Sequence, residues 1–424
     1  MSGLLPFLTA YDPPGSSEGT LDPMGLYQVA DRLAGDLVPA VRERMQRVRF
    51  LTPIAVGSFV TAGLEPNADE PQTAPFLVWE WLVIEAILRT YDGQDELWGV
   101  PGTLVTRRAI KQHGYLDSRS YLKTARIYGF HGVFKRLAVH VGLVSPDMNP
   151  RGPRTQALAE AWAQDSGLGG FDTKLLKKWR DAVQRSLRPP VRTRTSWQAS
   201  DWRELAEAFA PWLVGPREKA VLQQLLLDSD QLRALPAIWQ LQDELAGEDY
   251  TDEVALAALR KQEPVYASLI DAIFTYEAFG RALQDGFDLL RAAATGRDLH
   301  GLNLTSMADD TDFAGIAGRL PNLCERAQRT LTLHGLDLVS IFQNRFSSFL
   351  EPMAPHRLAL EITRHHERIQ QGKGDKRPWF DWLEEGSRLY VRASYRTARP
   401  EAQPQRFVHD YRAKPIRLFH NDLQ

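Results

Sequence analysis

Apolar residues recur at three- and four-residue steps along most of the chain, the spacing that places side chains on one face of an α-helix. The pattern is clear in Met24 to Leu37, Phe76 to Leu88, Tyr266 to Leu290 and Leu323 to Leu350. The C-terminal part also has strand composition, in 390–392 and 406–409, where prolines separate the two runs. The pattern predicts a mainly α, multi-domain protein with a small C-terminal α/β or β-hairpin segment.

Turn-forming residues and charge divide the chain into four predicted parts. These are a helical domain over 1–162, a basic linker and helix over 163–200, a helical bundle over 201–354, and a basic, aromatic segment over 355–424. The bundle carries an acidic stretch between 228 and 253, whereas 376–417 is rich in arginine. We expect 376–417 to form a partly β-structured surface that meets nucleic acid or an acidic partner. Its removal is then predicted to weaken association rather than the core.

The stretch 118–162 predicts a specific order of elements. A helix over about 121–128 is followed by Gly129, which allows a turn, and by a second helix that opens at Gly132. In that helix Val133, Leu137 and Val141 recur every four residues and form its inner face. Gly142 ends it, 143–144 begins a strand, 147–153 is rich in turn formers, and a further helix follows from Thr155.

This order resembles the winged helix-turn-helix modules of bacterial regulators, such as the MarR-like proteins. The likeness rests on the glycine turn before 132–141, on Gly142-Leu143-Val144 at its end, and on the helix TQALAEA after the hairpin. It covers about 118–162, and no family is named for the rest of the chain. The resemblance implies that 132–141 is a recognition helix that enters the major groove of DNA.

Charge agrees with that implication. Between Arg107 and Arg154 ten basic residues face two acids, although the whole chain has a net charge of −2. A second run, 174–194, holds eight basic residues and one acid. Such patches suit phosphate contacts. The predicted nucleic-acid-binding residues are His131, Lys135, Arg136, His140, Arg151, Arg154, Lys174, Lys177, Lys178 and Arg185. The alternatives are a winged helix that binds protein and, for 174–194, a solvated linker.

Catalytic and metal-binding patterns are weak. The single cysteine, Cys324, excludes an internal disulfide and a cysteine-based zinc site. In EITRHHE, Glu361 and His365 are four residues apart and could hold a metal, but exposed polar side chains on a helix are the favoured interpretation. The carboxylates of Asp309, Asp310 and Asp312 could hold a divalent ion, yet the usual nuclease pattern is missing. We expect no cofactor, no metal and no catalytic residue.

These observations favour a cytoplasmic protein without a membrane span, since the start lacks a signal-peptide pattern and no apolar run reaches 18 residues. The favoured function is that of a DNA-binding, non-catalytic subunit of a prokaryotic multi-protein DNA-handling or anti-phage defence system. Its expected partners are double-stranded DNA and other proteins or further copies of itself. The alternatives are a nucleic-acid-processing enzyme with a scattered active site, and a winged-helix adaptor for protein assembly.

Overall fold

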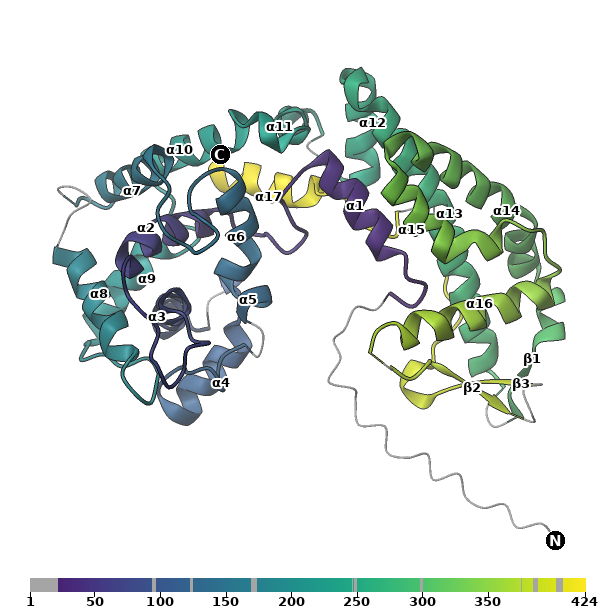
Figure 1. Ribbon diagram of the computed structural model, residues 1–424, viewed down its shortest axis with the longest axis horizontal. Coiled ribbons are helices and arrows are strands. Elements are labelled where there is room, and N and C mark those ends of the chain that lie inside the picture. Colours follow the sequence, from purple (N-terminus) through teal and green to yellow (C-terminus); the bar gives the residue numbers. More distant parts are fainter. Residues whose placement is uncertain are drawn as a thin grey trace, which may run out of the picture. The chain divides into compact units, whose positions relative to one another are not determined.

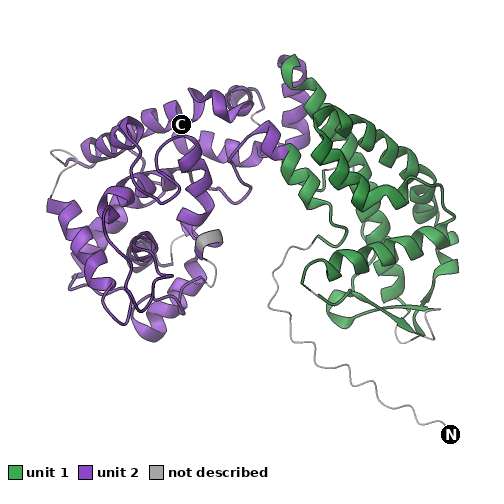
Figure 2. Cartoon of the chain, viewed as in Figure 1, with its two compact units in different colours: residues 1–33, 264–410 green, residues 34–263, 411–424 purple. Residues whose placement is uncertain are grey.

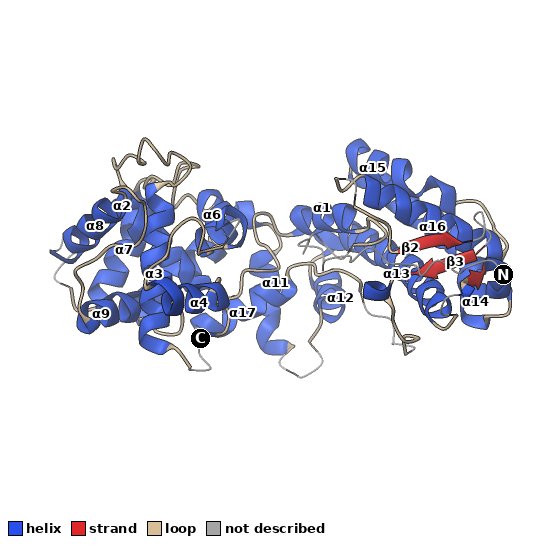
Figure 3. Ribbon diagram, turned by 90° about the horizontal axis from the view of Figure 1, so that it is seen from below, coloured by secondary structure: helices blue, strands red, loops and turns tan. Residues whose placement is uncertain are grey.

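The computed structural model confirms a mainly α protein with a small three-stranded antiparallel sheet (Figure 1, Figure 3). It describes residues 22–93, 97–122, 125–168, 174–245, 247, 250–297, 300–374, 376–383, 388–401 and 407–424, without the side chains of 126 and 127. The chain forms two compact units (Figure 2). Unit 1 comprises 1–33 and 264–410, and unit 2 comprises 34–263 and 411–424. The helix α1, Tyr27–Leu37, contributes to both.

Unit 2 is built around a short apolar helix. Its elements are η1 (Val48–Phe50), α2 (Leu51–Thr61), α3 (Pro75–Tyr91), α4 (Thr103–His113), α5 (Ala125–Tyr128), α6 (Phe130–His140), α7 (Pro153–Asp165), α8 (Lys174–Ser186), α9 (Ala199–Phe209), α10 (Pro216–Leu227), η3 (Asp230–Leu232), α11 (Leu235–Glu244), α12 (Asp252–Gln262) and α17 (Ala413–Leu423). Ten of the eleven residues of α2 are buried, and α3, α6, α7 and α8 all pack on it. Trp79, Trp162, Trp179 and Phe209 form a ring cluster beside it.

Unit 1 is a helical layer with the sheet at one end. Its elements are η4 (Pro264–Tyr266), α13 (Ala267–Thr295), β1 (Leu302–Asn303), η6 (Leu304–Ala308), α14 (Thr311–Leu331), η7 (Thr332–His334), α15 (Leu336–Phe346), η8 (Ser347–Phe349), α16 (Pro355–Gln371), β2 (Phe380–Leu383), β3 (Arg388–Val391) and η10 (Ala393–Tyr395). The long helix α13 packs against α14 and α16. The strand order is β1-β3-β2, with Leu302 opposite Leu389 and Phe380 opposite Val391.

The unit boundaries differ from the predicted ones. No division falls near 162 or 354, and the predicted bundle 201–354 is split at 263/264. Unit 2 also includes the last fourteen residues, 411–424, because Ile416, Phe419 and Leu423 of α17 are buried in its core. Contacts between distant segments decide such boundaries, and composition along the chain does not record them.

The C-terminal segment forms core, which contradicts the prediction that its removal would spare stability. Phe380, Leu389 and Val391 are buried in unit 1, and Tyr411 is buried in unit 2. The strand predicted at 390–392 is found as β3, Arg388–Val391, but its partners are β1 and β2 rather than 406–409. Residues 407–409 are not in a strand, and Arg406 lies outside the described residues.

The described arginines of this segment bond other groups of the protein, although their exposure differs, which gives them a structural role. Arg399 bonds the carboxylates of Asp310 and Asp312, at 2.7 and 2.6 Å. Arg412, only 1% exposed, pairs with Glu43 at 2.8 Å. The remaining partners are Asp381 for Arg392, Tyr390 for Arg396, the His300 carbonyl for Arg388, and the Tyr250 ring with the Leu245 and Gly247 carbonyls for Arg417.

Candidate nucleic-acid interface

The predicted helix-turn-helix lies in unit 2, where Gly129 alone separates α5 from α6. The helix α6 begins at Phe130, two residues before the predicted start at Gly132. Gly129 has an ordinary negative φ of −71°, so a left-handed turn is not why glycine stands there. A Cβ atom at this position would lie 1.9 Å from Oε1 of Glu80. Glycine is needed because a buried carboxylate approaches the backbone.

That carboxylate anchors the turn. Glu80 is fully buried in α3 and accepts hydrogen bonds from the Tyr121 hydroxyl at 2.9 Å and from the His131 backbone N–H at 2.9 Å. Nδ1 of His131 lies 2.5 Å from its second oxygen. Burial and the neighbouring Glu80 raise the pKa of Tyr121 well above its usual range. His131 is only 7% exposed, so its place is in this network rather than on a nucleic-acid surface.

The faces of α6 follow the predicted spacing. Val133 and Leu137 are buried, and so is Val141, directly after the helix. On the opposite side Arg136 is exposed and Lys135 is half-buried. Neither side chain has a hydrogen bond or ion pair with another described residue. His140 is half-buried, and its Nε2 lies 3.0 Å from the Gln231 carbonyl. The outward edge of α6 is therefore narrow and cationic.

A short hairpin, residues 143–151, follows α6 in the position of a wing. Val144 pairs with Pro150 in an antiparallel bridge, and the Ser145 N–H donates to the Asn149 carbonyl at 2.9 Å. Thr155 fastens the hairpin from α7, because its hydroxyl bonds the Leu143 carbonyl and accepts the Arg151 N–H. Gly142, with φ of +76°, makes the turn between α6 and the hairpin. Arg151 is exposed at the hairpin base, and its side chain has no partner in the described part of the chain.

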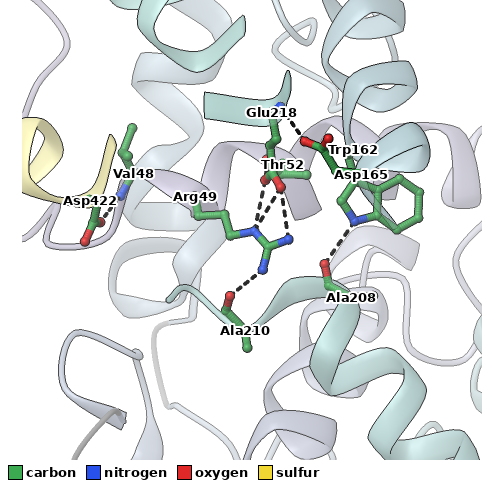
Figure 4. Close-up of polar contacts among 9 residues, drawn as sticks. All are labelled: Val48, Arg49, Thr52, Trp162, Asp165, Ala208, Ala210, Glu218 and Asp422. Atoms are coloured by element: carbon green, nitrogen blue, oxygen red, sulfur yellow. Dashed lines mark hydrogen bonds and ion pairs between the residues drawn. The ribbon is translucent and has the colours of Figure 1, made fainter. Parts of the chain in front are cut away.

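A buried ion pair, Arg49 with Glu218, fixes η1, on which α6 rests, and Figure 4 shows its bonds. Phe50 of η1 stacks on Phe130, with ring centroids 5.1 Å apart. Its neighbour Arg49 is 3% exposed and bonds both oxygens of Glu218, which is fully buried, at 2.9 and 3.0 Å. Thr52 donates to the same carboxylate at 2.5 Å. Each charge offsets the cost of burying the other, so the ion pair is stable in the core and holds η1 in place.

The second predicted basic region, on α8, is only partly available. Lys174 and Lys177 are exposed, and neither has a hydrogen bond or ion pair among the residues described. Lys178 instead bonds Asp201 at 2.5 Å and Glu204 at 2.6 Å. Burial alone would lower the pKa of the Lys178 ammonium, but these bonds outweigh it and raise the pKa. Arg185 is half-buried, and Arg154 donates to the Val141 carbonyl at 2.8 Å from an exposed position.

The predicted residues therefore form two groups in unit 2. Lys135, Arg136, His140, Arg151 and Arg154 lie on or beside α6, while Lys174, Lys177, Lys178 and Arg185 lie on α8. The sequence prediction missed Glu80 and Glu85, which are buried in α3 although they stand in the most apolar run of the chain. A charged residue within such a run was the available signal, because a helix buried on all sides must pair its charges.

The weak metal candidates do not come together. Among the described residues, no group of three or more His, Cys, Asp or Glu side chains could hold a metal ion. Asp310 caps α14 and pairs with Arg399. His365 and His366 are buried, which contradicts their predicted exposure, and burial lowers the pKa of each to about 4. Burial raises the pKa of Cys324 to about 12, so its thiol is protonated at neutral pH.

A cavity of about 430 Å³ lies beside α9 in unit 2, with Trp162 and Leu213 among its walls. Three of its charged side chains already have partners: Arg49 bonds Glu218, Asp165 accepts the Glu218 N–H, and Glu204 bonds Lys178. These groups are committed to the fold of unit 2.

Comparison with protein-family models, curated proteins and solved structures found no match to this chain. Among the described residues, every helix is too short or too polar to cross a membrane.

Proposed function

We propose that unit 2 is a double-stranded DNA-binding module without catalytic activity of its own. The observation that carries the proposal is the order α5, Gly129, α6, hairpin 143–151 and α7, with unpaired cations on α6 and at the hairpin base. A helix followed by a wing is a common arrangement for contact with a groove and its phosphates. We call Lys135, Arg136 and Arg151 the α6 surface.

The pairing of the cations supports this proposal more than their number does. Arg107 belongs to the same basic stretch of sequence, but it pairs with Asp92 at 2.6 Å. The three cations of the α6 surface have no carboxylate partner among the described residues. When an unpaired cation of the protein contacts a DNA phosphate, the salt cation bound to that phosphate is released. No ion pair within the protein has to be broken first, so the full gain contributes to DNA affinity.

Rigid support behind α6 is the second argument. The helix rests on η1 through Phe50 and on α3 through Glu80, and both contacts are buried. A surface held from behind by buried bonds meets DNA without a large ordering cost. The hairpin is likewise tied to α7 through Thr155.

The test is duplex binding measured at several salt concentrations. We expect the triple variant Lys135→Gln, Arg136→Gln, Arg151→Gln to bind more weakly, with a salt slope reduced by about 0.9 for each phosphate that the protein no longer neutralises. The matched control is Arg319→Gln, Arg326→Gln, Arg329→Gln, which removes the same charge from exposed positions on α14 of unit 1. If both triple variants bind DNA equally well, α6 is not the DNA contact. If the natural chain does not bind DNA, the proposed function is wrong.

A further inference from the structure

Two groups of cations without a partner among the described residues lie on or beside separate helices of unit 2. The first is the α6 surface. The second, which we call the α8 stripe, consists of Lys174, Lys177 and Arg188. Residues 174 and 177 are one helical turn apart, and Arg188 follows α8 by two residues, near the same line along the helix. All three are exposed and unpaired among the described residues, and half-buried Asp181 is the acid on that line.

The helix α2 separates the two surfaces. At its N-terminal end Phe50 stacks on Phe130 of α6, and at its C-terminal end the Val60 carbonyl accepts a bond from Arg180 of α8 at 3.0 Å. An eleven-residue helix is about 16 Å long. Figures 1 and 3 both place α6 and α8 on opposite sides of α2.

The two cationic faces point outward. The helix α8 packs inward through Trp179, Ala182 and Val183, so the α8 stripe faces away from α2. Adding the radii of two helices puts the outer faces on the order of 30 Å apart, well beyond the roughly 12 Å width of a major groove. A straight duplex on the α6 surface therefore does not reach the α8 stripe.

We infer that one copy of unit 2 holds two DNA duplexes at once, one on each surface, and so bridges them. This inference rests on the proposed function and assigns the α8 stripe to the second duplex. The stripe suits the sugar-phosphate backbone, because its three exposed cations follow one line and no aromatic side chain lies between them. Binding there is sequence-independent and sensitive to salt.

The experiment uses the full chain, a duplex fixed on beads and a fluorescent duplex of unrelated sequence. Capture of protein by the beads tests the proposed function, and retention of the fluorescent duplex tests the bridge. The natural chain should do both. The variant Lys174→Gln, Lys177→Gln, Arg188→Gln should still be captured but should retain no more fluorescent duplex than beads without protein. The α6 triple variant should be captured more weakly and should not bridge.

Each other result decides against the bridge. If the natural chain is not captured, the proposed function fails and the inference fails with it. Capture without fluorescence overturns the bridge alone. Bridging by the α8 variant would show that two copies supply the two surfaces, and a complete absence of capture for the α6 variant would show that the α8 stripe has no affinity of its own. The α14 triple variant, which also removes three positive charges, should behave as the natural chain, and equal melting temperatures exclude misfolding.

Discussion

Two arginine-rich regions that look alike in the sequence differ in what their charges contact. From 388 to 417, the described arginines bond carboxylates, carbonyl oxygens or a tyrosine hydroxyl of the protein itself. From 135 to 188, Lys135, Arg136, Arg151, Lys174, Lys177 and Arg188 have no such partner among the described residues. The arginines of the first region bond the fold, whereas these six cations of the second region leave their charges available to a partner. The presence or absence of a partner, rather than the density of charge, separates the two roles.

The largest expected effect comes from the region whose charges serve the fold. Truncation after Asp410 removes Tyr411, Ile416, Phe419 and Leu423, all at most 2% exposed. A single buried Phe→Ala change costs about 3–5 kcal/mol, so this truncation matches the whole stability of an ordinary domain. We expect the melting transition of unit 2 to disappear in circular dichroism. The variant Phe419→Ala should lower it, and Lys414→Ala, exposed on the same helix, should not. A truncated chain that melts normally would contradict the assignment of α17 to the core.

Within that region, burial should rank the arginines. Arg412→Met leaves Glu43 without its partner and alters a site that is 1% exposed, so we expect stability to fall by about 3 kcal/mol. Arg399→Met breaks pairs in which the arginine is 52% exposed, so the decrease should stay below about 1 kcal/mol. Urea unfolding measures both. Equal decreases would mean that solvent exposure does not determine how much these ion pairs contribute to the free energy of unfolding.

A pH dependence should mark α16, the helix that precedes that region in the chain. His366 accepts the Trp379 N–H at 3.0 Å and donates to the Pro23 carbonyl, while His365 donates to the Met24 carbonyl. The charges that act on them are those of Arg368, Glu361 and Arg345 for His365, and of Lys373, His365 and Arg291 for His366. Burial is the largest cause and lowers the pKa of each ring from 6.5 to about 4.

The sign follows from proton binding. Between pH 6.5 and pH 4 the two histidines bind protons in the unfolded chain but stay neutral in the folded chain. The free energy of unfolding is therefore highest above pH 6.5 and decreases as the pH is lowered below that value. Each histidine should cost about 2 kcal/mol between pH 7.5 and pH 5. Urea unfolding of the natural chain and of His366→Gln at both values measures this, and the stability of the variant should fall less on acidification. An equal fall in both would show that His366 does not titrate in this range.

The smallest expected effect is the difference between two arginines of the basic central stretch, Arg151 and Arg107. Arg151→Gln should reduce the salt slope of duplex binding by about 0.9, the value of one phosphate contact. Arg107→Gln should leave the slope unchanged, because Arg107 is paired with Asp92. The two changes remove the same charge from the same stretch of sequence. A larger change for Arg107→Gln would mean that pairing does not decide which cations meet DNA.

Local patterns in the sequence were enough to predict the helices of this region and their buried faces. The four-residue spacing of Val133, Leu137 and Val141 predicted an inner face that is indeed buried, because the period of a helix is local and is written in neighbouring residues. Gly142 and the turn formers after it likewise predicted the end of α6 and the hairpin. The start of α6 was placed two residues late, and the helix predicted over about 121–128 is found as α5, with 121–122 outside any helix.

The role of each polar side chain depends on long-range contacts that the sequence pattern did not reveal. Glu80 binds His131 from 51 residues away, and Glu43 binds Arg412 from 369 residues away. Because of these long-range contacts, His131 anchors the turn instead of contacting DNA, and Arg412 is part of the core instead of a binding surface. Long-range packing likewise places α6 and α8 at opposite ends of α2. Whether a charge is paired depends on which distant segment packs beside it, and local patterns carry no record of that choice.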